Sequence, residues 1–285
     1  MIAITGANGH LGQLVIEELV ERVPAKQIIA AVRSPEKASS FGVLGVQVRE
    51  ADYTRPETLS TALHDVKRVL LISASEVGQR FKKHKAVIDA AKEAGVEQFV
   101  YTSLLHADSS EMFLAQEHKQ TEEYIRASGL QFVILRNGWY LENHTSALGN
   151  AVEHGALIGS SNDGRFASAS RADYAAAAVV VLTQPVLGNK TYELAGDQSF
   201  SMTELASEVS GQLGRDIPYR NLSGEDYAAI LLGLGLPQMT VDVVIDADTK
   251  AIRGDLDSTS RDLSILIDRP TTTLSDAVRS ALRAH

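Results

Sequence analysis

Short runs of apolar, mostly β-branched residues alternate with longer segments of helical periodicity along the first two thirds of the chain. Such runs indicate buried strands, whereas apolar positions three and four residues apart indicate one face of a helix. This alternation is typical of an α/β fold in which crossover helices connect parallel strands. The predicted strands are Ile2–Thr5, Ile28–Val32, Val46–Arg49, Val69–Ile72, Phe99–Thr102 and Phe132–Leu135.

Helix signals fill the segments between these strands. A first helix follows Thr5 and is expected to end near Pro24, because proline resists helix continuation. Further helices are expected from about Arg80 to Ala94 and from Met112 to Ser128. A glycine follows each of these two helices and suits a C-cap.

The last third of the chain is less regular. Thr191–Leu194 is predicted as a strand and Met202–Leu213 as a helix with Ser201 as its N-cap. Tyr227 to Arg253 resists division because glycine and proline interrupt it, and Thr273–Arg283 is predicted as a closing helix. We expect this part to form a smaller α/β lobe.

A glycine-rich turn stands between the first strand and the first helix. In ITGANGHLG, Gly6, Gly9 and Gly12 are spaced as a turn that brings the backbone close to a pyrophosphate. Backbone N–H groups and the helix dipole favour an anion at this point. We therefore expect a dinucleotide to bind here, in a Rossmann-like doubly wound sheet.

Arg33 stands directly at the end of the second predicted strand, after Val32. An acidic residue at this position would accept hydrogen bonds from the adenosine ribose, whereas arginine suits a 2′-phosphate. The sequence thus favours NADP(H) over NAD(H), although an ordinary exposed arginine is the alternative. We expect residues 1–155 to form the dinucleotide-binding domain, its sheet completed within 165–195, and residues 156–285 to form an interdigitated substrate-side domain.

Composition narrows the class of protein. The 285 residues include 27 basic and 36 acidic ones, a net charge of −9, which argues against nucleic acid as a partner. Cysteine is absent, which excludes disulfides and thiolate nucleophiles, and the histidines show no metal-ligand spacing. The apolar run Ala175–Leu182 is far shorter than the roughly 20 residues of a membrane helix. We expect a cytoplasmic protein without metal or membrane insertion, and a homodimer on general grounds.

Polar residues follow the later strands, at the edge where open α/β sheets bind ligands. Asp52 follows the third strand and is a candidate for the adenine edge or a turn residue, and Ser73 and Ser75 follow the fourth. Thr102, which ends the fifth strand, is a candidate hydrogen-bond partner of nicotinamide. Lys82, Lys83 and Lys85 are interpreted as a solvated helix face.

The sequence lacks the pair of a tyrosine and a lysine four residues later that many short-chain dehydrogenases use. None of the eight tyrosines is followed four residues later by lysine, so a strong proton donor for an alkoxide is missing. Reduction of a quinone needs a weaker proton donor, because its phenolate product is a weaker base than an alkoxide. His118 and Glu122 lie four residues apart on one helical face, and His118 is a candidate for orienting the substrate or donating a proton.

Together these residues resemble the NmrA-like branch of the atypical short-chain dehydrogenase/reductases, and within it the bacterial NADPH:quinone reductases. The resemblance covers essentially the whole chain. Its carriers are MIAITGANGHLG, AAVRSPEKA, LLISASEVGQR, YTSLLHAD, LRNGWYLEN, ASRADYAAAA and TYELAGD.

This resemblance implies flavin-independent reduction of quinones by NADPH, held between a larger and a smaller domain. It implies that Arg33 holds the 2′-phosphate and that the pyrophosphate lies on Gly6, Ala7, Asn8, Gly9, His10, Leu11 and Gly12. Two segments would form further walls of the cofactor site: Ser75, Glu76, Val77, Gly78, Gln79 and Arg80, and Asn137, Gly138, Trp139, Tyr140, Leu141 and Glu142. The candidate substrate residues are Trp139, Tyr140, Asn143, Ser170, Arg171 and Asp173, with Tyr140 a second catalytic candidate beside His118.

Two other functions stay open at this stage. Some members of this family sense the nicotinamide redox state without turnover, and others reduce conjugated acceptors such as triphenylmethane dyes. A sugar epimerase is disfavoured, because it would need the missing tyrosine–lysine pair.

Overall fold

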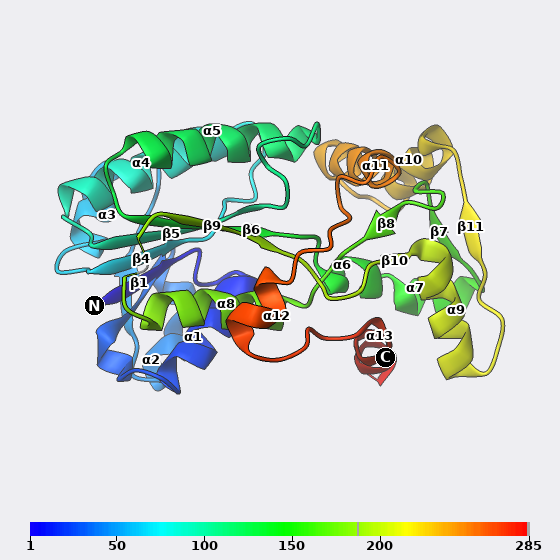
Figure 1. Ribbon diagram of the computed structural model, residues 1–285, viewed down its shortest axis with the longest axis horizontal. Helices are drawn as coiled ribbons and strands as arrows, with labels where there is room; N and C mark the ends of the chain where they lie inside the picture. Colours follow the sequence, from blue (N-terminus) through cyan, green and yellow to red (C-terminus); the bar gives the residue numbers. More distant parts are fainter. Residues whose placement is uncertain (187, 284–285) are drawn as a thin grey trace. The chain divides into compact units, whose positions relative to one another are not determined.

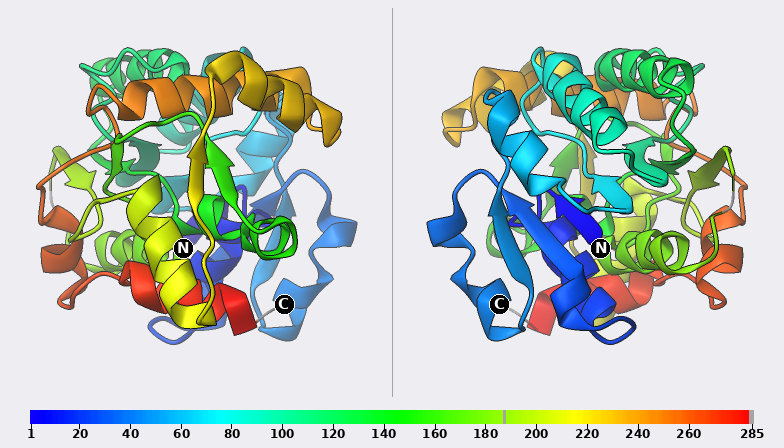
Figure 2. Two further views of the ribbon diagram at one scale, coloured as in Figure 1. Left: turned by 90° about the vertical axis from the view of Figure 1, so that its right-hand side faces the viewer. Right: turned by 90° about the vertical axis from the view of Figure 1, so that its left-hand side faces the viewer.

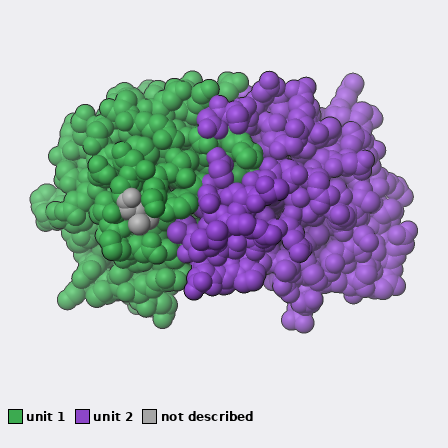
Figure 3. Space-filling model, in the orientation of Figure 1, with its two compact units in different colours: residues 1–107, 116–137, 171–192 green, residues 108–115, 138–170, 193–285 purple. Residues whose placement is uncertain are grey.

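The computed structural model (Figure 1) describes residues 1–186 and 188–283, which form two compact units (Figure 3). Unit 1 comprises residues 1–107, 116–137 and 171–192, and unit 2 comprises residues 108–115, 138–170 and 193–285. Residues 138–155, which we expected in the N-terminal domain, lie in unit 2, and 171–192 return to unit 1. The chain thus passes between the units repeatedly, and the domain boundary after residue 155 stays a prediction.

The main sheet has seven strands in the order β3-β2-β1-β4-β5-β6-β9. The pairs from β3 to β6 are parallel. The order runs outward in both directions from β1 and β4, which is the doubly wound arrangement predicted. The strands are β1 (Ile2–Thr5), β2 (Ile28–Val32), β3 (Gln47–Glu50), β4 (Arg68–Leu71), β5 (Gln98–Leu104), β6 (Phe132–Asn137) and β9 (Lys190–Leu194).

Helices cover both faces of the sheet in unit 1 (Figures 1 and 2). On one face lie α1 (His10–Val20), α2 (Ser39–Val43) and α8 (Arg171–Thr183), and α1 packs against α8. On the other lie α3 (Pro56–Ala62), α4 (Arg80–Glu93) and α5 (Phe113–Ala127), with α4 and α5 side by side. The central strands β1 and β2 are fully buried, so their sequences are apolar runs rather than alternating ones, whereas the edge strands β3 and β9 are more polar and only partly buried.

Unit 2 contains two small sheets. One pairs β8 (Arg165–Phe166) with β10 (Phe200–Ser201) antiparallel, and the other pairs β7 (Leu157–Gly159) with β11 (Tyr219–Asn221) parallel. Its helices are α6 (Leu141–Thr145), α7 (Leu148–His154), α9 (Met202–Leu213), α10 (Gly224–Gly233), α11 (Gln238–Ala251), α12 (Asp262–Ile267) and α13 (Leu274–Arg283). Short 3₁₀ turns occur at η1 (Ala25–Gln27) and η2 (Pro35–Lys37).

Local signals placed several helix ends correctly. The Ser201 hydroxyl accepts the Glu204 N–H while the Glu204 carboxylate accepts the Ser201 N–H, a capping box that starts α9 where predicted. The undivided stretch 227–253 separates into α10 and α11 at Gly235, whose φ is +84°, and at Pro237. Glycine supplies this left-handed conformation without steric strain, and proline suits the start of the next helix.

The apolar run Ala175–Leu182 lies within α8 and is almost entirely buried. It packs on the sheet and on α1, so its hydrophobicity serves the core. Among the residues that the structure describes, every helix is too short or too polar to cross a membrane.

Candidate functional site

A cavity of about 590 Å³ opens in unit 1 at the carboxyl ends of the first four strands. This volume lies in the range of small-molecule and cofactor sites. Nine predicted cofactor residues line it: Gly6, Ala7, Asn8, Gly9, Arg33, Asp52, Ser73, Ser75 and Glu76. The position matches the point where the strand order reverses, the usual ligand site of doubly wound sheets.

The glycine-rich turn forms one wall of the cavity. Gly6 has φ of +63°, a conformation that favours glycine, and its carbonyl accepts the Gly9 N–H at 2.9 Å. Helix α1 begins without a side-chain cap and without an acidic residue in its first turn. Its first N–H groups and the positive end of its dipole are therefore suited to a phosphate. The wall fits a pyrophosphate.

Two residues that we predicted to contact the pyrophosphate point toward the core and not toward the cavity. Leu11 is 5% exposed and packs in the core. Gly12 is buried in α1, where an added Cβ would lie 2.5 Å from the Gly6 carbonyl oxygen and 2.7 Å from Ala7 Cα. Their contribution is to let the turn pack closely on the helix, whereas His10, at the start of α1, is exposed.

Cationic side chains gather at the opposite wall. Arg33 lines the cavity with its side chain 72% exposed, and Lys37 and Lys83 line it as well. Glu76 lies beside them, with its carboxylate 3.7 Å from Arg33 Nη1 and paired with Lys83. The interpretation of Lys83 as part of a solvated face was wrong, because its side chain is only 17% exposed and points to this wall. This wall fits a 2′-phosphate.

Asp52 has the geometry of a turn residue. Its carboxylate accepts the Thr54 N–H at 2.9 Å and the Thr54 hydroxyl at 2.7 Å, and these bonds lower its pKa. The neighbouring Tyr53 also lines the cavity, and burial raises its pKa to about 12. Its phenol therefore stays protonated at neutral pH. Asp52 thus closes its own turn while it forms part of the wall.

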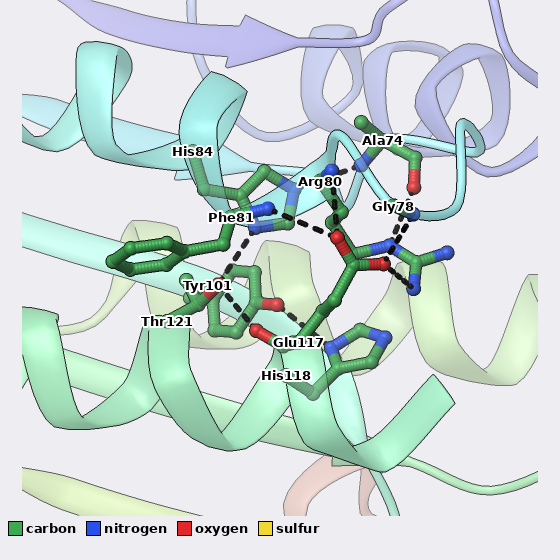
Figure 4. Close-up of polar contacts among 9 residues, drawn as sticks. All are labelled: Ala74, Gly78, Arg80, Phe81, His84, Tyr101, Glu117, His118 and Thr121. Carbon is green, nitrogen blue, oxygen red and sulfur yellow. Dashed lines mark hydrogen bonds and ion pairs between the residues drawn. The ribbon is translucent and has the colours of Figure 1, made fainter. Parts of the chain in front are cut away.

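The loop from β4 to α4 makes contacts that differ from the prediction. Thr102 Oγ1 accepts the Ser73 N–H at 2.9 Å, so this hydroxyl anchors the loop. The N–H groups of Gly78 and Arg80 donate to the Glu117 carboxylate at the start of α4 (Figure 4). These donors face Glu117 rather than the cavity, and Val77, Gly78, Gln79 and Arg80 are absent from its lining.

His118 and Glu122, which share one face of α5, have different partners. Glu122 is 3% exposed and accepts two bonds from Arg136, at 2.9 and 2.7 Å, and one from Ser103 at 2.6 Å. It is thus the acceptor of a buried ion pair. His118 Nδ1 instead lies 2.7 Å from the Tyr101 hydroxyl.

Burial sets the charge of His118. It is 5% exposed, and burial together with the nearby Arg80 guanidinium holds its pKa well below the usual value of about 6.5. The imidazole is therefore neutral at pH 7. A neutral ring can donate or accept a hydrogen bond but holds no cationic proton, which favours the orienting role over proton donation.

Asn137 ends β6 as a buried amide without a protein partner. It is 4% exposed, and neither its Nδ2 nor its Oδ1 has a hydrogen-bond partner in residues 1–186 and 188–283. Buried amides are almost always paired, so an unpaired one suits a bound ligand or water. A carboxamide, with one donor and one acceptor, would complement it. Asn137 is absent from the lining of the cavity, and its contact with the cofactor stays a prediction.

The candidate substrate residues fall in both units. Trp139, Tyr140, Asn143 and Ser170 belong to unit 2, together with the wall residues Gly138, Leu141 and Glu142, and Arg171 and Asp173 begin α8 in unit 1. Tyr140 bridges to Ala169, and the Ser170 hydroxyl lies 3.0 Å from Thr272 Oγ1. Asp173 is fully buried in the first turn of α8, where a carboxylate stabilises a helix. Their substrate roles stay predictions.

The sequence reasoning left out three residues that shape this site: Lys37, Lys83 and Glu117. Lys83 stands one turn into the helix that follows β4, a position close to the ligand edge, and this was the available signal. Glu117 carried no signal, because its partners are 37 and 39 residues away. Metal sites were not expected, and among the described residues no group of three or more acidic or histidine side chains converges.

Three buried histidines predict acid sensitivity. Burial lowers the pKa of His84 to about 3, that of His144 to about 4, and that of His118 well below 6.5. Below pH 6.5 the unfolded chain binds protons that the folded chain does not, so the free energy of unfolding falls as pH falls. Each histidine contributes up to about 1.4 kcal/mol per pH unit. The midpoint of urea unfolding is expected to drop steadily between pH 6.5 and 5.

The range from pH 6.5 to 5 lies above the pKa values of ordinary carboxylates, so protonation of carboxylates contributes little to the change in stability there. His64→Gln is the comparison for an exposed histidine, because the His64 side chain is 77% exposed. His144→Leu removes one of the three groups and should flatten the dependence of the midpoint on pH. A midpoint that does not change with pH would contradict the assignment.

Known proteins match this chain over nearly its whole length. A family model described as NAD(P)H-binding matches residues 6–185. Escherichia coli quinone oxidoreductase 2 is 50% identical over 98% of this chain and 97% of that protein. A crystal structure of an NADPH-dependent quinone oxidoreductase of E. coli complexed with NADPH has a TM-score of 0.96, at 50% identity, and covers 99% of this chain and 100% of that one.

Two further relatives agree on the family. Citrobacter sp. triphenylmethane reductase complexed with NADP(H) has a TM-score of 0.94, at 35% identity, over 99% of this chain and 100% of that one. An NmrA-like family domain-containing oxidoreductase of Aspergillus flavus is 32% identical over 79% of this chain and 75% of that protein. These matches confirm the resemblance inferred from the sequence motifs. The chain belongs to the NAD(P)H-binding family, in its NmrA-like branch.

Proposed function

We propose that this protein reduces quinones to hydroquinones with NADPH. The observation that carries the proposal is the 50% identity to Escherichia coli quinone oxidoreductase 2 over nearly all of both chains. The cavity supports it independently, because a glycine turn, an uncapped helix and an arginine at the end of β2 suit NADP(H). The proposal includes direct transfer without flavin, a cytoplasmic location and a homodimer.

In this proposal the residues of the chain bind and orient rather than form covalent bonds. Bound NADPH supplies two electrons and one hydrogen as hydride, and one proton from solvent completes the hydroquinone. Arg33 holds the 2′-phosphate, and the Gly6–Gly9 turn and the start of α1 hold the pyrophosphate. The unpaired amide of Asn137 offers a donor and an acceptor to a carboxamide.

Proton chemistry supports a quinone as the acceptor. No tyrosine is followed by lysine four residues on, and burial keeps the Tyr53 phenol protonated and His118 neutral. Stabilising an alkoxide calls for a strong proton donor, the role that a tyrosine–lysine pair would fill. A phenolate is a weaker base, so orientation beside the cofactor supplies most of the rate. The roles of Trp139 and Tyr140 as flat walls for the quinone ring belong to this proposal.

A second function deserves a direct test. The triphenylmethane reductase of Citrobacter sp. has a TM-score of 0.94 to this chain, so a dye is the next acceptor to try. The third candidate function is that of a redox sensor without turnover. Such a protein would bind NADPH as tightly as an enzyme does. Only turnover separates it from a reductase.

The test follows NADPH or NADH absorbance with purified protein and a simple benzoquinone, with the uncatalysed reactions subtracted. We expect rapid quinone-dependent loss of NADPH, slower loss of NADH, and no increase on adding flavin. Turnover with a triphenylmethane dye alone would move the assignment to dye reduction. Tight NADPH binding without turnover of any acceptor would favour the redox sensor.

A further inference from the structure

Glu117, on α5, accepts hydrogen bonds from the loop that precedes α4 (Figure 4). Its Oε2 accepts the Gly78 N–H at 3.0 Å, and its Oε1 accepts the Arg80 N–H at 2.9 Å. Oε1 also lies 3.4 Å from Phe81 N, and Oε2 lies 3.5 Å from Arg80 Nη1. The carboxylate thus caps the start of α4 from another helix, and charge-assisted bonds of this kind are strong.

The other end of the same loop is held at Ala74. Its N–H donates to His84 Nε2 at 2.9 Å, and its carbonyl accepts Arg80 Nε at 2.7 Å. Because a backbone N–H can only donate, His84 Nε2 is unprotonated and its proton lies on Nδ1. Nδ1 then donates to Thr121 Oγ1, 3.1 Å away on α5. Arg80 is therefore joined to both ends of the loop.

Ser75 and Glu76 lie between these two fixed points, and both line the cavity. Both side chains are exposed, and Glu76 is held besides by its ion pair with Lys83 on α4. Glu76 reaches the cationic wall, 3.7 Å from Arg33. The position of this stretch of wall thus depends on the two anchors, and Glu117 is the acidic side chain that takes part in them.

We propose that Glu117 is a positioning residue for NADPH binding: it holds the β4–α4 loop in the conformation that places Ser75 and Glu76 along the cofactor. This rests on the proposed function. Glu117 does not touch the cavity itself, since it is absent from the lining, and it acts through the N–H groups of Gly78 and Arg80.

Loss of the carboxylate is expected to loosen the loop and, because the buried Arg80 guanidinium loses its counter-ion, to lower the free energy of unfolding as well. Gly78 is exposed, so water can replace the lost acceptor there. The loop then samples other conformations, and the apparent affinity for NADPH falls in proportion to the competent fraction. If this fraction drops to roughly one tenth, the dissociation constant rises roughly tenfold.

The test compares the full-length protein with its Glu117→Ala and Glu117→Gln variants. Hydrogen exchange is measured across the chain, NADPH binding by direct titration, and kcat and KM with benzoquinone. We expect faster exchange confined to residues 75–81, roughly tenfold weaker NADPH binding, and a higher KM with kcat changed less. Glu117→Gln keeps one acceptor oxygen and should give an intermediate result, and it is the variant of choice if Glu117→Ala fails to fold.

Glu123→Ala is the matched control, because Glu123 is an exposed carboxylate on the same helix. If hydrogen exchange at residues 75–81 is unchanged in both Glu117 variants, Glu117 does not hold the β4–α4 loop, and the proposal is wrong. Faster exchange with NADPH affinity within about twofold of wild type would overturn the role of Glu117 in positioning the cofactor. If the wild-type protein binds no NADPH, the proposed function is wrong. Hydrogen exchange would still test whether Glu117 holds the β4–α4 loop.

Discussion

Gly12→Ala is expected to abolish measurable NADPH binding and to lower the free energy of unfolding by roughly 3 kcal/mol. A Cβ at this position would lie 2.5 Å from the Gly6 carbonyl oxygen, 2.7 Å from Ala7 Cα and 2.8 Å from the Ala7 carbonyl oxygen. All three are backbone atoms, so no side chain can rotate away. The turn must shift, and with it the N–H groups that face the pyrophosphate. Urea unfolding and direct NADPH titration measure both effects.

Gly211→Ala is the control for this substitution. Gly211 lies within α9, and an added Cβ would meet nothing within 4 Å. Alanine there should stabilise the protein by about 0.5–1 kcal/mol, because it restricts the unfolded chain and suits a helix. If Gly12→Ala bound NADPH as wild type does, close packing of the turn on α1 would not be needed for the site.

Arg33→Glu is expected to weaken NADPH binding roughly 100-fold and to change NADH binding only a few-fold. A charge-assisted bond to the 2′-phosphate contributes about 1.5–3 kcal/mol, and reversal of the charge adds repulsion. Glu76, 3.7 Å from Arg33, would then stand beside a second carboxylate at the same wall. NADH has a hydroxyl in place of the phosphate and loses little. The two dissociation constants are measured by titration at one salt concentration.

Lys92→Glu makes the same change in net charge at an exposed position in the last turn of α4. Lys92→Glu should leave the affinities for NADPH and NADH near those of wild type. This result would show that Arg33 acts through a local contact and not through the net charge of the protein. Equal weakening of NADPH and NADH by Arg33→Glu would rule out a 2′-phosphate contact. Raising the salt concentration should narrow the preference for NADPH, since screening weakens exposed charges.

The parts of the fold that the sequence predicted correctly depend on neighbours along the chain. β1 and β2 begin and end where their apolar runs do, and α9 starts at a capping box whose two members are three residues apart. The glycine turn and Arg33 were likewise recognised from a strand, a turn and a helix in succession. The comparisons with known proteins then confirmed the family that these motifs indicate.

The predictions that failed concern which side chains meet across the fold. Helical spacing placed Glu122 and His118 on one face but did not show that Glu122 binds Arg136 on β6. Helical spacing tells which residues share a face, and it leaves open which partner on another element that face meets. For the same reason Lys83 was placed in solvent, although tertiary packing directs it to the cavity wall.

Local sequence patterns therefore predicted the strands of the main sheet, the start of α9, the phosphate turn and the arginine after β2. Each of these is encoded in dihedral preferences, capping and periodicity over a few residues. Three contacts became known from the three-dimensional packing alone: Glu117 caps α4, His84 holds Ala74, and Arg136 neutralises Glu122. These contacts arise when packed helices and strands bring distant polar groups together, and burial then requires each of them to find a partner.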